Sequence, residues 1–313
     1  ASNWALAQNK KWDLIISTFG PYSCHLIAKN IKKKSPKTFW IADFRDIWTL
    51  SHVTKGIPPF TLLENILEKS IMKKADLITI VSDPLTEQLS LKYPKSNIAT
   101  IENGFDLDDL KQLPKENIFE DKSKLRILYT GSIYEGKRDP SPLFEAIKNI
   151  KEIDPILLKN FEVHFIGPNM KIIEHLAAKY DIEEYIILGA NLPRMTALQM
   201  QRDTDILLFL EVESPNIPGI LTGKLFEYLN STSPIWAVGV SNKTISGKLI
   251  EDANAGIAFG KDVKLIQNRL QLFLTEKTIK PVDITHSKIK YFDRCTLAMK
   301  ILDNFNIQNR ELD

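Results

Sequence analysis

Short apolar runs alternate with longer amphipathic stretches along the whole chain, a pattern typical of a doubly wound α/β protein. The first series predicts four parallel strands, over residues 13–17, 38–43, 77–81 and 98–101. The helical patterns between these strands lie near residues 22–34, 59–74 and 83–92. The second series predicts six strands, over residues 125–129, 163–166, 186–188, 206–210, 235–238 and 256–259. Six strands with intervening helices make a complete Rossmann-like domain, so the first domain, with only four, is expected to be incomplete.

A polar stretch between the two series predicts a linker between two domains. We therefore expect an N-terminal domain, a linker, a second domain and a C-terminal segment over residues 1–110, 111–124, 125–286 and 287–313. The C-terminal segment has the pattern of one amphipathic helix that ends in a polar tail.

The composition is that of a soluble globular protein, with 43% hydrophobic and 26% charged residues in 313. The net charge of +2 gives no general reason to expect nucleic-acid binding. Two cysteines far apart, Cys24 and Cys295, favour a reducing compartment and indicate neither a disulfide framework nor a metal site. We find neither a secretory signal nor an apolar run long enough to span a bilayer, so we expect a cytoplasmic protein. The chain begins with Ala1 instead of Met, which suggests processing or a start inside a longer chain.

The segment Leu221–Leu229 is the most informative part of the chain. The small residues Thr222 and Gly223 follow one predicted strand and open a helix at the edge of the parallel sheet. Such a helix start offers unpaired N–H groups and a positive dipole end, which favour phosphate. Lys224 adds a positive charge, and Glu227, one turn later, can accept two hydrogen bonds from a ribose diol. The segment predicts a nucleotide or nucleotide-sugar site, although Lys-x-x-Glu also occurs as an ordinary surface pair.

The start of the second domain, Tyr129–Pro140, places a tight turn and two cations at the carboxyl end of a strand. Gly131 and Ser132 form the turn, and Lys137 and Arg138 follow it. This is neither G-x-G-x-x-G nor a P-loop. Ligands of α/β proteins bind at this edge of the sheet, and Arg and Lys can hold a diphosphate there. A solvated turn with surface charges fits the same pattern.

Taken together, these segments resemble the donor-binding domain of GT-B glycosyltransferases, especially the large retaining family 4. Phe39–Trp48 resembles the ADFRDxW segment of bacterial polysaccharide enzymes in that group, and Ala75–Ser82 and Ile101–Asp106 resemble its ADxIxxVS and xNGxD segments. The resemblance covers about residues 11–305. It implies two Rossmann-like domains, with the C-terminal helix crossing back to the first. It also implies transfer of a hexosyl-type sugar from a nucleoside-diphosphate-sugar to a glycan or lipid-linked glycan, with retention.

The resemblance implies a set of cations and hydrogen-bonding groups around the donor. The residues expected to act on the leaving diphosphate and the ribose are Lys137, Arg138, Lys224 and Glu227. Those expected to line the donor site are Gly131, Ser132, Gly189, Leu221, Thr222 and Gly223. Fixed cations stabilise the charge that develops on the leaving group, and they can replace a metal ion. We therefore expect neither a metal nor another cofactor.

The chain departs from the family pattern at two turns. Ser132 stands where family members commonly have Arg, so Arg138 is expected to compensate. Many members have a His after the strand where this chain has Arg45 and Asp46, and one of these two would then face the sugar or acceptor.

A third departure concerns the family's Glu-x7-Glu pair. The position eight residues before Glu227 is Gly219. The earlier carboxylate, which faces the transferred sugar in the family, would come from Glu213 or Glu211, or be absent.

Two further loops follow predicted strands. The loop at Gly189 could hold a base through its backbone, and a plain strand–helix connection is equally compatible with it. In the family, loops such as residues 17–25 border the acceptor site, so Tyr22 and His25 are candidates for acceptor contact. An ordinary capped helix with a structural histidine is the alternative.

The first long helix ends in a cluster of lysines, namely Lys29, Lys32, Lys33, Lys34 and Lys37. A solvated helix end that interacts with its dipole explains them most simply. Contact with anionic lipids, as a peripheral protein on the inner face of the membrane, is the alternative.

Three rival interpretations remain open. A nucleotide-sugar epimerase shares the GT-B fold and would form its product from the donor alone. A non-catalytic partner subunit would bind nucleotide-sugar without transferring it. A truncated fragment would lack about 80–100 upstream residues, the size of the missing strands of a full Rossmann-like half.

Overall fold

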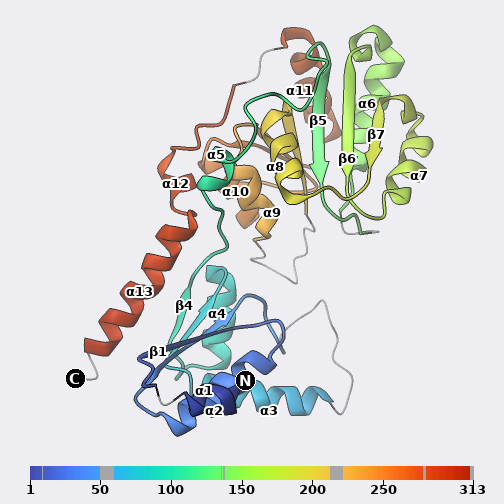
Figure 1. Cartoon of the computed structure of the whole chain (residues 1–313). Coiled ribbons are helices and arrows are strands. Elements are labelled where there is room, and N and C mark those ends of the chain that lie inside the picture. The colour runs from blue at the N-terminus through green and yellow to red at the C-terminus, as the bar shows by residue number, and fades with distance from the viewer. Residues whose placement is uncertain are drawn as a thin grey trace. The chain divides into compact units, whose positions relative to one another are not determined.

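The computed structural model describes residues 1–8, 10–49, 60–134, 136, 138–211, 221–277 and 280–310, with side chains as far as residue 306. The chain forms two compact units (Figure 1). The N-terminal unit comprises Ala1–Asn103, Pro215–Leu221 and Cys295–Asp313. The C-terminal unit comprises Gly104–Ser214 and Thr222–Arg294.

The N-terminal unit is built on a four-stranded parallel sheet, as the apolar runs predict. Its strands, in spatial order, are β1 (Leu14–Thr18), β2 (Phe39–Phe44), β3 (Leu77–Ile80) and β4 (Ile98–Thr100). Its helices are α1 (Ser2–Ala7), α2 (Ser23–Lys34), α3 (Phe60–Met72), α4 (Asp83–Lys92) and most of α13 (Arg294–Arg310). The spatial order follows the chain order, so the described strands of this unit contain no point at which the order reverses.

The alternation of side chains along β2 divides the core of this unit into two layers. Trp40, Ala42 and Phe44 pack on one side, together with residues from α2, α3 and α4. Phe39 packs on the other side, where its ring meets that of Phe305 of α13 edge-on, with ring centres 5.2 Å apart. The C-terminal helix therefore covers the second face of the sheet.

The C-terminal segment is not one continuous helix. It forms α12 (Ser287–Lys290) and then α13, with a turn between them. In this turn, the carbonyl of Phe292 accepts the N–H of Phe105, and the carbonyl of Phe105 accepts the N–H of Arg294. The prediction of one helix from Ser287 is wrong because these backbone groups bond to a distant segment instead of continuing the helical ladder.

The C-terminal unit contains the six predicted parallel strands. They are β5 (Leu125–Thr130), β6 (Phe161–Ile166), β7 (Ile186–Gly189), β8 (Ile206–Leu210), β9 (Ile235–Val238) and β10 (Gly256–Gly260). Their spatial order is β10-β9-β8-β5-β6-β7, the Rossmann order. The order reverses between β5 and β8, where Ile127 is in register with Ile206.

The longer helices of this unit follow its strands. They are α6 (Ser141–Ile153), α7 (Lys171–Tyr180), α8 (Arg194–Asp203), α9 (Gly223–Leu229), α10 (Ile245–Asp252) and α11 (Val263–Glu276). The predicted linker region also holds a one-turn helix, α5 (Asp108–Lys111), and 3₁₀ turns cover Pro155–Leu158 and Glu183–Tyr185.

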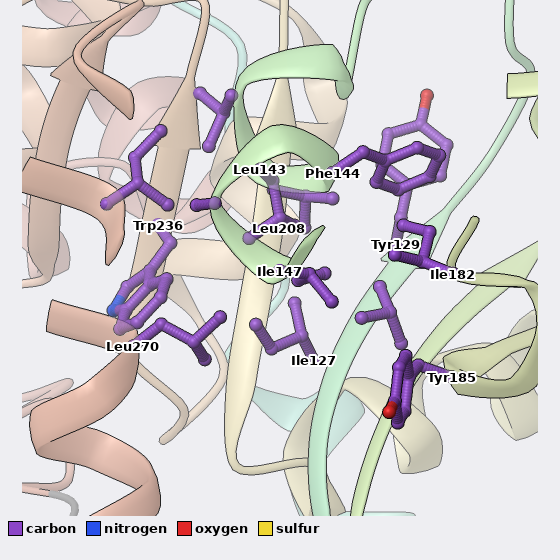
Figure 2. Close-up of a cluster of buried hydrophobic side chains, with 14 of the residues drawn as sticks. Ile127, Tyr129, Leu143, Phe144, Ile147, Ile182, Tyr185, Leu208, Trp236 and Leu270 are labelled. Atoms are coloured by element: carbon purple, nitrogen blue, oxygen red, sulfur yellow. The ribbon is translucent and has the colours of Figure 1, made fainter. Parts of the chain in front are cut away.

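A large apolar cluster covers one face of the sheet of the C-terminal unit (Figure 2). Other apolar residues, such as Leu207, Phe209 and Leu225, are buried outside this cluster. Ile127 and Tyr129 of β5 lie in it beside Phe144 and Ile147 of α6. Both strands that flank the reversal of strand order are buried along their whole length. This packing holds the carboxyl ends of β5 and β8 in place.

Candidate functional site

A group of charged side chains gathers at the carboxyl ends of β5 and β8. Gly131 directly follows β5, and Glu211 directly follows β8. The helix that comes next along the chain, α9, brings Lys224 and Glu227. In open α/β sheets, ligands bind at this reversal of strand order. The structure thus brings together, within one unit, predicted site residues that are far apart in the sequence.

Lys224 is the most unusual residue of this group. Its ammonium nitrogen, Nζ, lies 3.9 Å from the centre of the Tyr129 ring, within range of a cation–π interaction. Nζ is buried and has no hydrogen-bond partner among the described residues. Burial, and then the nearby charge of Arg138, lower the pKa of Lys224 to about 7. An unpaired buried ammonium is costly, so it is poised to accept an anionic ligand.

Gly131 makes room for this ammonium. Its φ of +121° disfavours other residues, and a Cβ there would lie 2.6 Å from Nζ of Lys224. The glycine therefore serves both the tight turn and the close approach of the lysine.

Arg138 lies beside Lys224 and is held by the turn after β5. Its Nη1 donates to the carbonyl of Ser132 at 2.7 Å, and the hydroxyl of Tyr129 donates to the same carbonyl at 2.8 Å. Ser132 thus contributes a backbone anchor for the arginine that was predicted to replace the family's Arg. Lys137, the other predicted cation, lies outside the described residues.

Glu211 is a buried carboxylate at the same edge. Burial raises its pKa to about 7, against the opposing effects of the Ser246 and Thr222 hydroxyls and of nearby cations. Its Oε1 has no hydrogen-bond partner within the described part of the chain. The sequence left open whether Glu211 or Glu213 supplies a carboxylate here, and the structure places Glu211 in the group. Glu213 and Gly219 lie outside the described residues.

Glu227 lies three residues after Lys224 on α9 and is half-buried. Its charge helps to raise the pKa of Arg194 and opposes the lowering of the pKa of Lys224. We find no hydrogen bond from its carboxylate to any described residue, so its oxygens are available to a ligand.

A buried network fixes α9 against the end of β5. The hydroxyl of Tyr228 accepts the N–H of Thr130 at 3.0 Å, and Gln201 donates to the hydroxyl of Thr130 at 2.9 Å. Tyr129, Tyr228 and Gln201 are not among the site residues predicted from the sequence. The one available signal was the position of Tyr228 and Tyr129 next to predicted site residues.

The remaining predicted donor residues have mixed surroundings. Thr222 is the N-cap of α9 and Gly223 its first residue. Leu221 groups instead with the N-terminal unit, where its carbonyl accepts from Asn103 at 3.1 Å. The carbonyl of Gly189 accepts a backbone N–H, and a Cβ on Gly189 would lie 2.5 Å from a methyl carbon of Ile166. Packing therefore accounts for Gly189, and its contact with a base stays a prediction.

In the N-terminal unit, Arg45 and Asp46 differ in their surroundings. Nε of Arg45 donates to the buried carboxylate of Asp43 at 2.8 Å, and Asp43 also accepts from the hydroxyl of Thr79 at 2.7 Å. Asp46 is exposed. The arginine is thus fixed in orientation, whereas the aspartate is accessible to solvent.

His25 is fully buried and belongs to a short hydrogen-bonded chain. The indole N–H of Trp40 donates to Ser17 Oγ at 2.8 Å, and Ser17 Oγ lies 2.8 Å from Nδ1 of His25. Burial lowers the pKa of His25 to about 4. Nε2 has no partner among the described residues.

Tyr22 and His25 belong to one aromatic cluster. The ring of Tyr22 stacks on Trp48 with centres 4.7 Å apart, and His25 stacks on Phe44 at the same distance. Phe19 lies between the two pairs, in contact with Trp48, His25 and Phe44. The two predicted acceptor residues are therefore neighbours in the structure, and their contact with an acceptor stays a prediction.

Within the described ranges, no three His, Cys, Asp or Glu residues gather closely enough to hold a metal ion. Cys24 and Cys295 are free thiols. No helix in the described part of the chain has the length and apolar character needed to cross a bilayer.

Comparison with known proteins identifies the fold but no family. No protein-family model and no curated protein sequence matches the chain. Among solved structures, a trehalose 6-phosphate synthase from Burkholderia multivorans matches with a TM-score of 0.66 and 10% identity, over 99% of this chain and 74% of the other. The lipopolysaccharide outer core galactosyltransferase WaaB matches with a TM-score of 0.58 and 17% identity, over 97% and 76%. A structure from Listeria monocytogenes named as a UDP-N-acetylglucosamine 2-epimerase matches with a TM-score of 0.56 and 17% identity, over 100% and 78%. The chain thus has the GT-B fold, with two parallel α/β domains.

Proposed function

We propose that this protein is a glycosyltransferase that moves a sugar from a nucleoside-diphosphate-sugar to a glycan or lipid-linked glycan. The observation that supports this most strongly is the unpaired, buried ammonium of Lys224 beside Arg138, where the strand order reverses. Two cations fixed at that point suit a diphosphate better than a neutral ligand.

The cations act on the leaving group in this proposal. When the bond between the anomeric carbon and the diphosphate breaks, negative charge develops on the diphosphate and positive charge on the sugar. Lys224 leaves the Tyr129 ring to pair with that negative charge, assisted by Arg138 and Lys137. The acceptor hydroxyl then forms the new bond to the anomeric carbon, and its proton leaves with the diphosphate. Fixed positive charges lower the barrier of this step, so we propose that transfer needs no metal ion.

The carboxylates bind the neutral parts of the donor. Glu227 accepts hydrogen bonds from the ribose diol, because its oxygens bond to no described residue and lie one helical turn from Lys224. Glu211 takes the place of the upstream carboxylate that faces the transferred sugar, since its Oε1 is buried and has no partner among the residues described. We propose a hexosyl donor and retention of configuration on the family resemblance alone.

The N-terminal unit handles the acceptor in this proposal. The hydroxyl of Tyr22 and the ring of His25 are the candidate contacts to the acceptor, with Arg45 and Asp46 as charged contacts. The proposed acceptor is a growing bacterial glycan. A lipid-linked acceptor would bring this cytoplasmic enzyme to the inner face of the membrane.

A turnover assay tests the proposal and separates it from its nearest rival. Radiolabelled nucleoside-diphosphate-sugars are incubated with the protein, with and without lipid-linked or oligosaccharide acceptors. Label that moves to the acceptor supports transfer. A new nucleotide-sugar formed from the donor alone would establish instead the epimerase reaction, which the resemblance to the Listeria structure makes the second candidate.

Lys224→Met tests whether this site carries the activity. We expect the variant to lose transfer, and Lys248→Met, at an exposed lysine of α10, to retain it. Equal activity of both variants would contradict the assigned role of Lys224.

A further inference from the structure

The helix α3 exposes a run of large apolar side chains on the N-terminal unit. The exposed fractions are 63% for Phe60, 68% for Leu62, 53% for Leu63 and 57% for Ile66. The side of the helix opposite Leu62 and Ile66 is buried through Ile71 and Met72, and Phe60, eleven residues before Ile71, lies nearer to that side. Single exposed apolar residues are common, but a group such as Leu62, Leu63 and Ile66 on one side of a helix marks an interaction surface.

Lysines continue the same face of α3 toward its C-terminal end. Positions 62, 66, 69 and 73 follow the helical spacing of four, three and four, so Lys69 and Lys73 extend the stripe begun by Leu62 and Ile66. Lys69, Lys73 and the following Lys74 are exposed. Glu68 is fully buried and paired with Lys92 at 2.9 Å, so its negative charge does not offset the lysines on this surface. The face is therefore apolar at one end and positive at the other.

The neighbouring helix α2 adds fewer free lysines than its sequence indicates. Lys29 donates to Ser70 of α3 at 2.7 Å, which ties the two helices together. Lys32 pairs with Asp76 at 2.7 Å. The ammonium groups of both lysines therefore bind to groups within the unit. The exposed lysines near the C-terminal end of α2 are Lys33, Lys34 and Lys37. Figure 1 shows α2 and α3 next to each other in this unit.

We propose that the α3 face, formed by Leu62, Leu63, Ile66, Lys69, Lys73 and Lys74, docks on an anionic lipid bilayer. The apolar half enters the boundary between headgroups and acyl chains, and the lysines contact lipid phosphates. A second copy of this chain is a poorer occupant, because an antiparallel two-fold contact through this face would set the lysine end of one helix against the apolar end of the other and desolvate its charges. The inference deepens the proposed function by placing the enzyme where lipid-linked acceptors are found, and it rests on that function only for this consequence.

Co-sedimentation with lipid vesicles tests the docking directly. The full chain is mixed with vesicles of equal parts phosphatidylcholine and phosphatidylglycerol, or of phosphatidylcholine alone. We expect binding to the anionic vesicles and little to the neutral ones. The double variant Leu62→Glu with Ile66→Glu should weaken binding by about tenfold or more, since it removes apolar burial and adds repulsion. Leu91→Glu, at a residue of α4 that is 84% exposed, is the matched control and should bind as the unmodified chain does.

A charge series tests the lysines separately. Changing Lys69, Lys73 and Lys74 to Gln should weaken binding by about fivefold for each lysine removed. The same number of changes at exposed lysines of the C-terminal unit, Lys171, Lys261 and Lys264, keeps the net charge equal and should have little effect. An equal loss in both triple variants would overturn the proposal, because only the total charge would then matter.

Two other results would also overturn it. One is binding that does not depend on anionic lipid. The other is a dimer in solution that Leu62→Glu with Ile66→Glu dissociates, which would assign the face to a second copy of the chain. Stabilisation by donor nucleotides, measured on the same variants, reports on the C-terminal unit, so the failure of this inference is distinguishable from the failure of the proposed function.

Discussion

The ammonium of Lys224 rests over the ring of Tyr129, 3.9 Å from its centre, with no hydrogen-bond partner among the described residues. The ring supplies a weak, non-directional attraction in place of a counter-ion. Because this cation–π contact is weaker than an ion pair, breaking it costs little free energy when Lys224 pairs with an incoming diphosphate.

The contact between Lys224 and the Tyr129 ring can be tested by changing the ring and the hydroxyl of Tyr129 separately. Tyr129→Phe keeps the ring and loses the hydroxyl's bonds to the carbonyl of Ser132 and to Arg138, so we expect a small change in the dissociation constant of the donor. Tyr129→Leu removes the ring, which holds Lys224 only in the empty site, so donor binding should tighten by about fivefold, the worth of a cation–π contact of about 1 kcal/mol. Calorimetric titration with the donor measures both, and equal effects of the two variants would argue against the ring's role.

Donor affinity should fall as the pH rises above neutral. The empty site holds Lys224 with a pKa of about 7, so above that pH a proton must be taken up before the lysine can pair with the diphosphate. The affinity should then fall by up to about tenfold for each pH unit above 7, until the higher pKa of Lys224 in the complex is reached.

Glu211 reinforces this trend, because it also titrates near pH 7 and its charged form repels the diphosphate. In Lys224→Arg, whose side chain stays charged, donor affinity should depend much less on pH. Adding Glu211→Gln should remove the remaining pH dependence of donor affinity. A donor affinity that rises with pH in the unmodified protein is the result incompatible with this assignment.

Glu227→Ala should weaken donor use by about one to two orders of magnitude. Charge-assisted hydrogen bonds to the ribose are worth roughly 1.5–3 kcal/mol each. The ratio kcat/KM for the donor measures the effect, with Glu145→Ala on the exposed face of α6 as the control. Unchanged kinetics in a folded Glu227 variant would remove it from the site.

His25 should make the protein sensitive to mild acid. Its pKa is about 4 in the folded state and 6.5 in the unfolded state, so the unfolded chain binds the proton more readily. The free energy of unfolding should therefore fall as the pH drops from 6.5 toward 4, by about 3 kcal/mol in total from this residue. Denaturant midpoints at several pH values should show a smaller decrease for His25→Phe. An equal decrease in both proteins would show that the histidine is protonated in the fold.

Glu68 should be essential to the stability of the N-terminal unit. Its buried carboxylate accepts from the backbone and hydroxyl of Thr49 at 2.9 and 2.8 Å, from Lys92 at 2.9 Å and from the Tyr93 hydroxyl at 2.5 Å. Glu68→Gln removes the charge that these donors share and should cost about 3 kcal/mol of unfolding free energy. Chemical denaturation is the measurement, and Glu87→Gln, at an exposed glutamate of α4, should cost almost nothing.

The strands could be predicted because each is a short, continuously apolar run, as buried parallel strands require. The grouping of Gly131 with Lys224 followed from their shared place after strands of one sheet. What the sequence could not give were contacts between distant segments. The break between α12 and α13 depends on hydrogen bonds to the backbone of Phe105. The ammonium of Lys29 is bound by the hydroxyl of Ser70, which lies on another helix. The burial of Glu211 depends on the packing around the end of β8, which local pattern does not determine.

The most direct test of the central claim is a thermal-shift titration with UDP-, GDP-, ADP- and dTDP-sugars, without added metal. We expect the sugars of one of these nucleotides to raise the melting temperature of the unmodified chain and of Lys248→Met, by an amount that grows with ligand concentration. Lys224→Met should show no such rise. Equal stabilisation of Lys224→Met, or no response of the unmodified chain to any of the four, would contradict a nucleotide-sugar site built on Lys224.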